Sequence, residues 1–120
     1  MKAEALKGHL DGLLLASLDA GPLHGYAIME SLRAGSGGEV DLPTGTIYPA
    51  LRRLERAGLI KGTWSESGGR RRRVYELTAA GRRALDGERG SWRRFSETMT
   101  ALLEPASRPL QGQQPSPVTL

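Results

Sequence analysis

Arginine is the residue type in this sequence that most clearly indicates a binding function, and most of the arginines lie in one stretch. Residues 43–85 hold ten lysines and arginines against three acidic residues, a net charge of +7, so the chain's total of +4 leaves −3 elsewhere. Guanidinium groups bind phosphates and guanine through paired hydrogen bonds. Neutralising phosphates is the main source of sequence-independent DNA affinity, so the stretch indicates a polyanion partner. A merely solvated charged face is the alternative.

The other reactive residue types give little support to catalysis. Cysteine is absent, which excludes thiol nucleophiles, zinc–thiolate sites and disulfides and suits the cytoplasm. His9 and His24 have no acid or thiol beside them in a ligand pattern, so no metal site is expected. Paired carboxylates near a histidine and a glycine-rich phosphate loop are also missing, and we expect neither an enzyme nor a cofactor. No apolar run approaches the roughly 20 residues of a membrane span.

Helical spacing of apolar residues predicts the elements that carry the basic stretch. Leucines predict a first helix over residues 6–18, ending near Gly21-Pro22, and a second helix follows over 23–32. A third helix is expected over 44–57, with Thr44 or Thr46 as its N-cap and Gly58 as its stop. Its buried face should comprise Ile47, Ala50, Leu51 and Leu54.

The period then changes from 3.6 to 2, which predicts a hairpin with strands over 59–65 and 71–77 and a turn over 66–70. Trp64 and Tyr75 are expected to pack across it. Thr78 is the expected N-cap of a fourth helix, whose apolar residues recur every seven positions and therefore need a partner helix. We divide the chain into a domain over 1–77, a dimerisation helix over 78–104 and a disordered tail over 105–120.

Three helices followed by a hairpin are typical of a winged helix-turn-helix, so the expected fold is mainly α with a small β-hairpin. In such a fold the third helix enters the major groove of double-stranded DNA and the hairpin, or wing, contacts the backbone. The expected DNA contacts from these two elements are Thr44, Thr46, Tyr48, Arg52, Arg53, Arg70, Arg71, Arg72 and Arg73.

The sequence also resembles the PadR family of transcriptional regulators. The residues that carry the resemblance are LLLASLDAGPLHGYAIMESL (13–32), PTGTIYPALRRLERAGLI (43–60) and SGGRRRRVYELTAAGRRAL (67–85). It implies a homodimer joined by the C-terminal helix, repression at an inverted-repeat operator, and release by a small molecule. Two more residues of these motifs, His24 and Tyr26, become candidates for DNA contact, although His24 could instead cap the second helix and either tyrosine could simply bridge helices.

Within the family, the chain is similar to the short members that sense drugs through a tryptophan of the terminal helix. That similarity makes Trp92 the candidate platform for a flat aromatic or lipophilic effector, with Leu15 and Ser96 beside it; a plain role in the dimer core is the alternative. Glu88 and Arg89 depart from the more apolar pattern of those members. The expected dimer contacts are Leu6, Leu10, Leu85, Phe95, Met99 and Leu102.

A winged helix that binds only proteins is the main competing interpretation. It predicts a neutral or acidic recognition face, whereas Arg52, Arg53 and the arginine-rich hairpin indicate the reverse.

Overall fold

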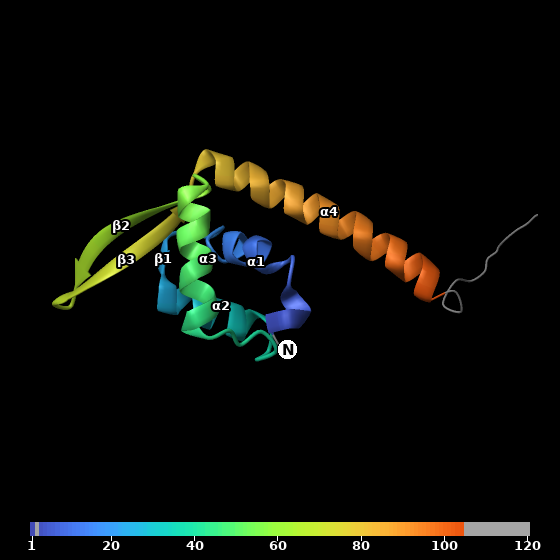
Figure 1. Cartoon of the computed structure of the whole chain (residues 1–120), viewed down its shortest axis with the longest axis horizontal. Coiled ribbons are helices and arrows are strands. Elements are labelled where there is room, and N and C mark those ends of the chain that lie inside the picture. Colours follow the sequence, from blue (N-terminus) through green and yellow to red (C-terminus); the bar gives the residue numbers. More distant parts are fainter. Residues whose placement is uncertain (2, 105–120) are drawn as a thin grey trace, which may run out of the picture. The chain divides into compact units, whose positions relative to one another are not determined.

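A computed structural model describes Met1 and residues 3–104, so the tail expected over 105–120 lies outside the described residues. These residues form, in chain order, a short 3₁₀ helix, three helices with a small strand between the first two, a hairpin and a long helix (Figure 1). The elements are η1 (Ala3–Leu6), α1 (Leu10–Ser17), β1 (Leu23–His24), α2 (Gly25–Gly35), α3 (Thr44–Arg56), β2 (Ile60–Ser67), β3 (Arg70–Leu77) and α4 (Ala79–Leu103).

The described part of the chain divides into two compact units, Met1–Glu88 and a second unit that begins at Arg89. The first unit contains every element up to the start of α4, and the second contains the remainder of that helix. No described helix is both long enough and apolar enough to cross a membrane.

The first two helices begin and end differently from the sequence prediction. Instead of one helix over 6–18, η1 and α1 are separated at Gly8, whose φ of 88° lies outside the helical region. α1 ends at Ser17, before the predicted Gly21-Pro22. Residues 23–24, predicted as helix, pair as a strand with β3. Periodicity cannot identify a two-residue strand whose partner lies some fifty positions away.

α3 begins at Thr44, within the predicted window, but the predicted threonine N-cap is wrong. Pro43 is the N-cap and provides no side-chain hydrogen bond. Its carbonyl oxygen accepts from the backbone amides of Thr46 (2.9 Å) and Ile47 (3.1 Å). Pro49 lacks an amide hydrogen and interrupts the helical bonding once, early in the helix. The predicted buried face is confirmed, since Ile47, Ala50, Leu51 and Leu54 are all buried.

The predicted hairpin is confirmed and is longer than expected. β2 and β3 pair antiparallel from Ile60↔Leu77 to Ser67↔Arg70, and Gly68-Gly69 alone form the turn. Both glycines have positive φ, 59° and 76°, which a tight hairpin turn needs and other residues resist. With β1 on the other side of β3, the described residues make a three-stranded sheet in the order β1-β3-β2. Figure 1 shows β2 and β3 projecting away from α1, α2 and α3.

One apolar cluster in the first unit holds α1, α2, α3 and the sheet together. Its largest fully buried side chains are Leu14, Leu15, Leu18, Ile28, Ile47, Leu51, Leu54 and Ile60. At the start of α4, the predicted cap is confirmed: the Thr78 hydroxyl accepts from the Gly81 amide (3.0 Å) and donates to the Gly58 carbonyl (2.6 Å). The base of the hairpin and the next helix are thereby joined at one side chain.

Candidate nucleic-acid interface

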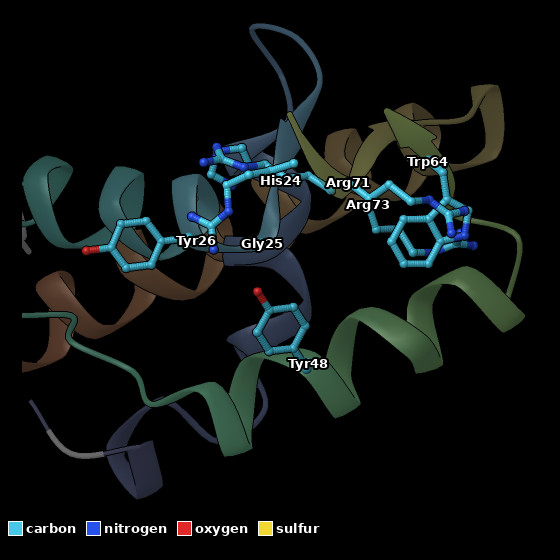
Figure 2. Close-up of a pocket in the computed structure, with 9 residues that line it drawn as sticks. His24, Gly25, Tyr26, Tyr48, Trp64, Arg71 and Arg73 are labelled. Carbon is cyan, nitrogen blue, oxygen red and sulfur yellow. The ribbon is translucent and has the colours of Figure 1, made fainter. Parts of the chain in front are cut away.

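A concave surface of about 630 Å³ lies where the start of α2, the exposed side of α3 and the hairpin meet (Figure 2). All of its residues belong to the first unit. Its lining consists of His24, Gly25, Tyr26, Tyr48, Trp64, Arg70, Arg71, Arg72 and Arg73. Four arginines and three aromatic rings therefore surround one hollow. Seven of these nine residues are among the predicted DNA contacts; Gly25 and Trp64 are the additions.

Tyr48 fixes how closely α2 and α3 approach each other at this hollow. The half-buried ring rises from α3 and its hydroxyl points toward Gly25, the first residue of α2 (Figure 2). A β-carbon at Gly25 would lie 2.5 Å from that hydroxyl oxygen, so only glycine allows this contact. Tyr26, by contrast, is exposed and available to a ligand.

The two adjacent arginines of α3 have different surroundings. Arg53 forms a salt bridge with Asp11 of α1. Arg52 is exposed and forms no salt bridge in the part of the chain that the structure describes. Successive residues of a helix are turned by about 100°, so one of the pair faces α1 and the other does not. Thr44 is exposed and Thr46 half-buried at the start of the same helix.

The hairpin arginines also differ from one another. Arg73 forms a salt bridge of 2.5 Å with Glu55 of α3, and both side chains are mostly buried. Arg71 and Arg73 both lie over the exposed ring of Trp64. Arg70 is exposed at the turn. Trp64 and Tyr75, predicted to pack across the hairpin, are not directly opposite each other, because the register pairs Trp64 with Arg73 and Tyr75 with Gly62. Tyr75 is buried in the core, whereas Trp64 is exposed.

His24 connects the hairpin to α2 and is confirmed as a cap. Its Nδ1 accepts from the Ala27 amide at 3.3 Å, and its Nε2 lies 2.8 Å from the Arg72 guanidinium. A guanidinium only donates hydrogen bonds, and a neutral imidazole has a single acceptor nitrogen. The ring therefore accepts from Ala27 or from Arg72, but not from both at once.

The predicted effector and dimer residues fall into two groups. Leu6, Leu15 and Leu85 are buried in the core of the first unit, which leaves them almost no surface for a partner or ligand, and Leu10 packs partly against that core. In the second unit, Trp92, Phe95 and Leu102 are well exposed, Met99 is exposed and Ser96 is half-buried. The rings of Trp92 and Phe95 are 5.8 Å apart and inclined by 34°.

Sequence reasoning missed the acidic and glycine residues that engage the arginines. Asp11 lies 42 positions from Arg53, and Glu55 lies 18 from Arg73. Local pattern carries no signal for such pairs, because only the tertiary fold brings them together. Gly62 was also missed, although a glycine inside a predicted strand often marks a close approach.

The sequence model described as "Transcriptional regulator PadR-like family" matches residues 14–87. An uncharacterised 37.1 kDa protein of a Streptomyces fradiae transposon is 43% identical over 84 residues, which is 70% of this chain. Those residues span only 23% of that relative's length.

Solved structures give a similar result. The Eggerthella lenta PadR family transcriptional regulator is 34% identical with a TM-score of 0.72, and the match covers 84% of this chain and 87% of that one. A PadR-like transcriptional regulator of Bacillus cereus is 31% identical with a TM-score of 0.75, covering 85% and 98%. Both alignments extend over most of each chain, so the similarity is to whole structures.

Proposed function

The chain belongs to the PadR-like family of transcriptional regulators, and from that premise we propose that its concave basic surface binds double-stranded DNA. The observation that carries the proposal is that the hollow brings Tyr48 of α3 and four hairpin arginines to one side of the first unit. The fold is a winged helix-turn-helix, in which α3 enters the major groove and the hairpin flanks it.

The candidate DNA contacts differ in whether the side chain already has a partner within the protein. Thr44, Thr46, Tyr48 and Arg52 of α3 are available for base edges and phosphates. Arg70 and Arg71 of the hairpin and Tyr26 of α2 are exposed and available to contact the phosphate backbone or the minor groove of DNA. Arg53 and Arg73 would first have to exchange a carboxylate for a phosphate, so we assign them a smaller share of the affinity. The Arg72 guanidinium contacts the His24 ring, so we expect these two side chains to contact DNA as a pair.

The proposed functional unit is a homodimer that represses transcription in the cytoplasm from an inverted-repeat operator. The division into a DNA-binding domain over 1–77 and a dimerisation helix over 78–104 belongs to this proposal. The support is the row of exposed apolar side chains on α4, because such a row is costly in water and is typical of a helix–helix interface. A two-fold dimer reads two half-sites about one DNA turn apart. Trp92 and Ser96, beside Phe95, are the proposed effector contacts.

The test of DNA binding uses duplexes selected by the protein from a random pool, with affinity measured by fluorescence anisotropy at several salt concentrations. Arg52→Ala should lower affinity by about tenfold, as expected for loss of one base or phosphate contact, and reduce the salt slope by about one. Arg33→Ala is the matched control, because Arg33 lies near the other end of α2 and is paired with Glu30.

The control variant should stay within roughly twofold of the wild type, since surface charges remote from DNA contribute little. Wild-type protein that selects no duplex even at low salt, or equal losses in the two variants, would contradict the assignment of this surface.

A further inference from the structure

Trp64 has no structural role in the apolar core. It lies in β2 and is 57% exposed, within a hairpin whose tip consists of serine, glycine and charged residues. The guanidinium carbon of Arg71 lies 4.5 Å from the centre of the ring, and that of Arg73 lies 5.5 Å away (Figure 2). Both distances are within the range of cation–π attraction. The large exposed ring therefore serves as a surface on which two arginines rest.

Two guanidinium groups beside one ring would repel each other without a counter-charge, and Glu55 supplies it. Its carboxylate is 2.5 Å from Arg73, and the two side chains are only 28% and 33% exposed. Burial strengthens this pair relative to one in open solvent. The charge of Arg73 is thereby neutralised within the fold, while that of Arg71 stays available to a ligand.

Gly62 provides the space in which Arg73 is held. A β-carbon at this position would lie 2.7 Å from the Arg73 Nε and 3.0 Å from its guanidinium carbon. Arg73 is therefore enclosed by the β2 backbone, by the ring of Trp64 and by Glu55. Because Glu55 belongs to α3, this series of contacts runs from the helix into the hairpin and ends at Arg71.

We propose that Trp64 is a positioning residue for DNA binding, holding the Arg71 guanidinium at the edge of the hollow in the orientation that a phosphate requires. The inference rests on the proposed DNA-binding function. A free arginine side chain must give up its rotamer freedom when it binds a phosphate. An arginine already resting on an aromatic ring has lost part of that freedom, so more of its interaction with DNA contributes to affinity.

The experiment measures affinity for the selected duplex in four variants: Trp64→Leu, Trp64→Phe, Arg71→Ala and the double variant Trp64→Leu/Arg71→Ala. Leucine keeps an apolar side chain but removes the π face, so Trp64→Leu should weaken binding by about three- to tenfold, whereas Trp64→Phe should recover most of the loss. If Trp64 acts through Arg71, the double variant should bind about as well as Arg71→Ala alone.

Two results would overturn the proposal: a Trp64→Leu protein that binds like the wild type, or a double variant whose loss equals the product of the two single losses. The second result would indicate that the indole contacts DNA by itself. Trp64 is exposed, so thermal unfolding should be unchanged in these variants and serves as the folding control. If instead the wild type binds no duplex, the DNA-binding proposal fails, which is a different outcome.

Discussion

Arginines close together in the sequence have different partners within the fold. Arg53 is bound to Asp11, whereas Arg52 has no salt bridge among the described residues. Along β3, Arg73 is bound to Glu55 while Arg71 rests on Trp64. A side chain already paired with a carboxylate gains less from a phosphate, because it must give up the first partner. The count of arginines therefore overstates the number of strong DNA contacts.

The buried phenol of Tyr75 should make stability depend on pH in the alkaline range. Burial of its phenol raises its pKa above the usual 10.0, although the nearby Arg73 opposes the shift. The folded protein therefore retains this proton at pH values where the unfolded chain loses it. The stability contribution is fully present below about pH 10 and is lost as pH rises further, by at most about 1.4 kcal/mol per pH unit.

The melting temperature of the wild type should consequently fall more steeply above pH 10 than that of Tyr75→Phe. Tyr26→Phe is the control, because Tyr26 is exposed and its loss should leave the wild-type profile unchanged. Parallel profiles for the wild type and Tyr75→Phe between pH 9 and 11 would show that burial of this phenol has no such effect.

Among the helices and strands, α4 has an apolar repeat that no described part of this chain buries along its second half. Its apolar side chains repeat every seven residues, as in a coiled-coil seam, yet those from Trp92 onward are exposed within this chain. A helix on its own gains little from such a seam, so we expect a second copy of the helix to cover it.

We expect the oligomeric state of the protein to depend on this seam. Phe95→Glu places a charge in the seam and should convert the protein from dimer to monomer in sedimentation equilibrium, because an unpaired charge is costly to bury in an interface. DNA affinity should fall with it, since a monomer reads one half-site. Thr100→Glu adds the same charge outside the seam of the same helix and should remain dimeric. If both variants are dimers, another surface joins the subunits.

At the scale of the whole molecule, effector and DNA are expected to affect each other's binding equally. An effector that lowers the affinity for DNA by some factor must itself be bound more weakly, by the same factor, when DNA is present. The proposed effector contacts lie on α4 and the DNA contacts lie in the first unit. Their coupling therefore has to act through a change that both ligands influence in the assembled dimer.

This reciprocity can be measured by the fluorescence of Trp92 in a Trp64→Phe background, which leaves one tryptophan in the chain. Flat lipophilic aromatic compounds should quench this fluorescence, and the titration gives their dissociation constant. Saturating duplex should raise that dissociation constant by the same factor by which the compound weakens DNA binding, typically 5- to 150-fold in coupled systems. No quenching across a varied panel would assign Trp92 to the dimer core alone.

Much of the fold follows from local pattern. The buried face of α3, the hairpin with its glycine turn and the Thr78 cap were all predicted, because each depends on residues a few positions apart. The arginines of the hairpin were predicted for the same reason, since they are consecutive in the sequence. β1, the break at Gly8 and the Pro43 cap were not, since these depend on long-range pairing or on details of the backbone.

Family membership and the presence of a basic helix and wing follow from composition and motif spacing, without any knowledge of the fold. Which of those arginines remain available depends on how the elements pack. Asp11, Glu55 and Trp64 reach their arginines from other elements, and a salt bridge or a ring contact forms only at distances of a few ångströms. Chain separation says nothing about such distances until the helices and strands have packed.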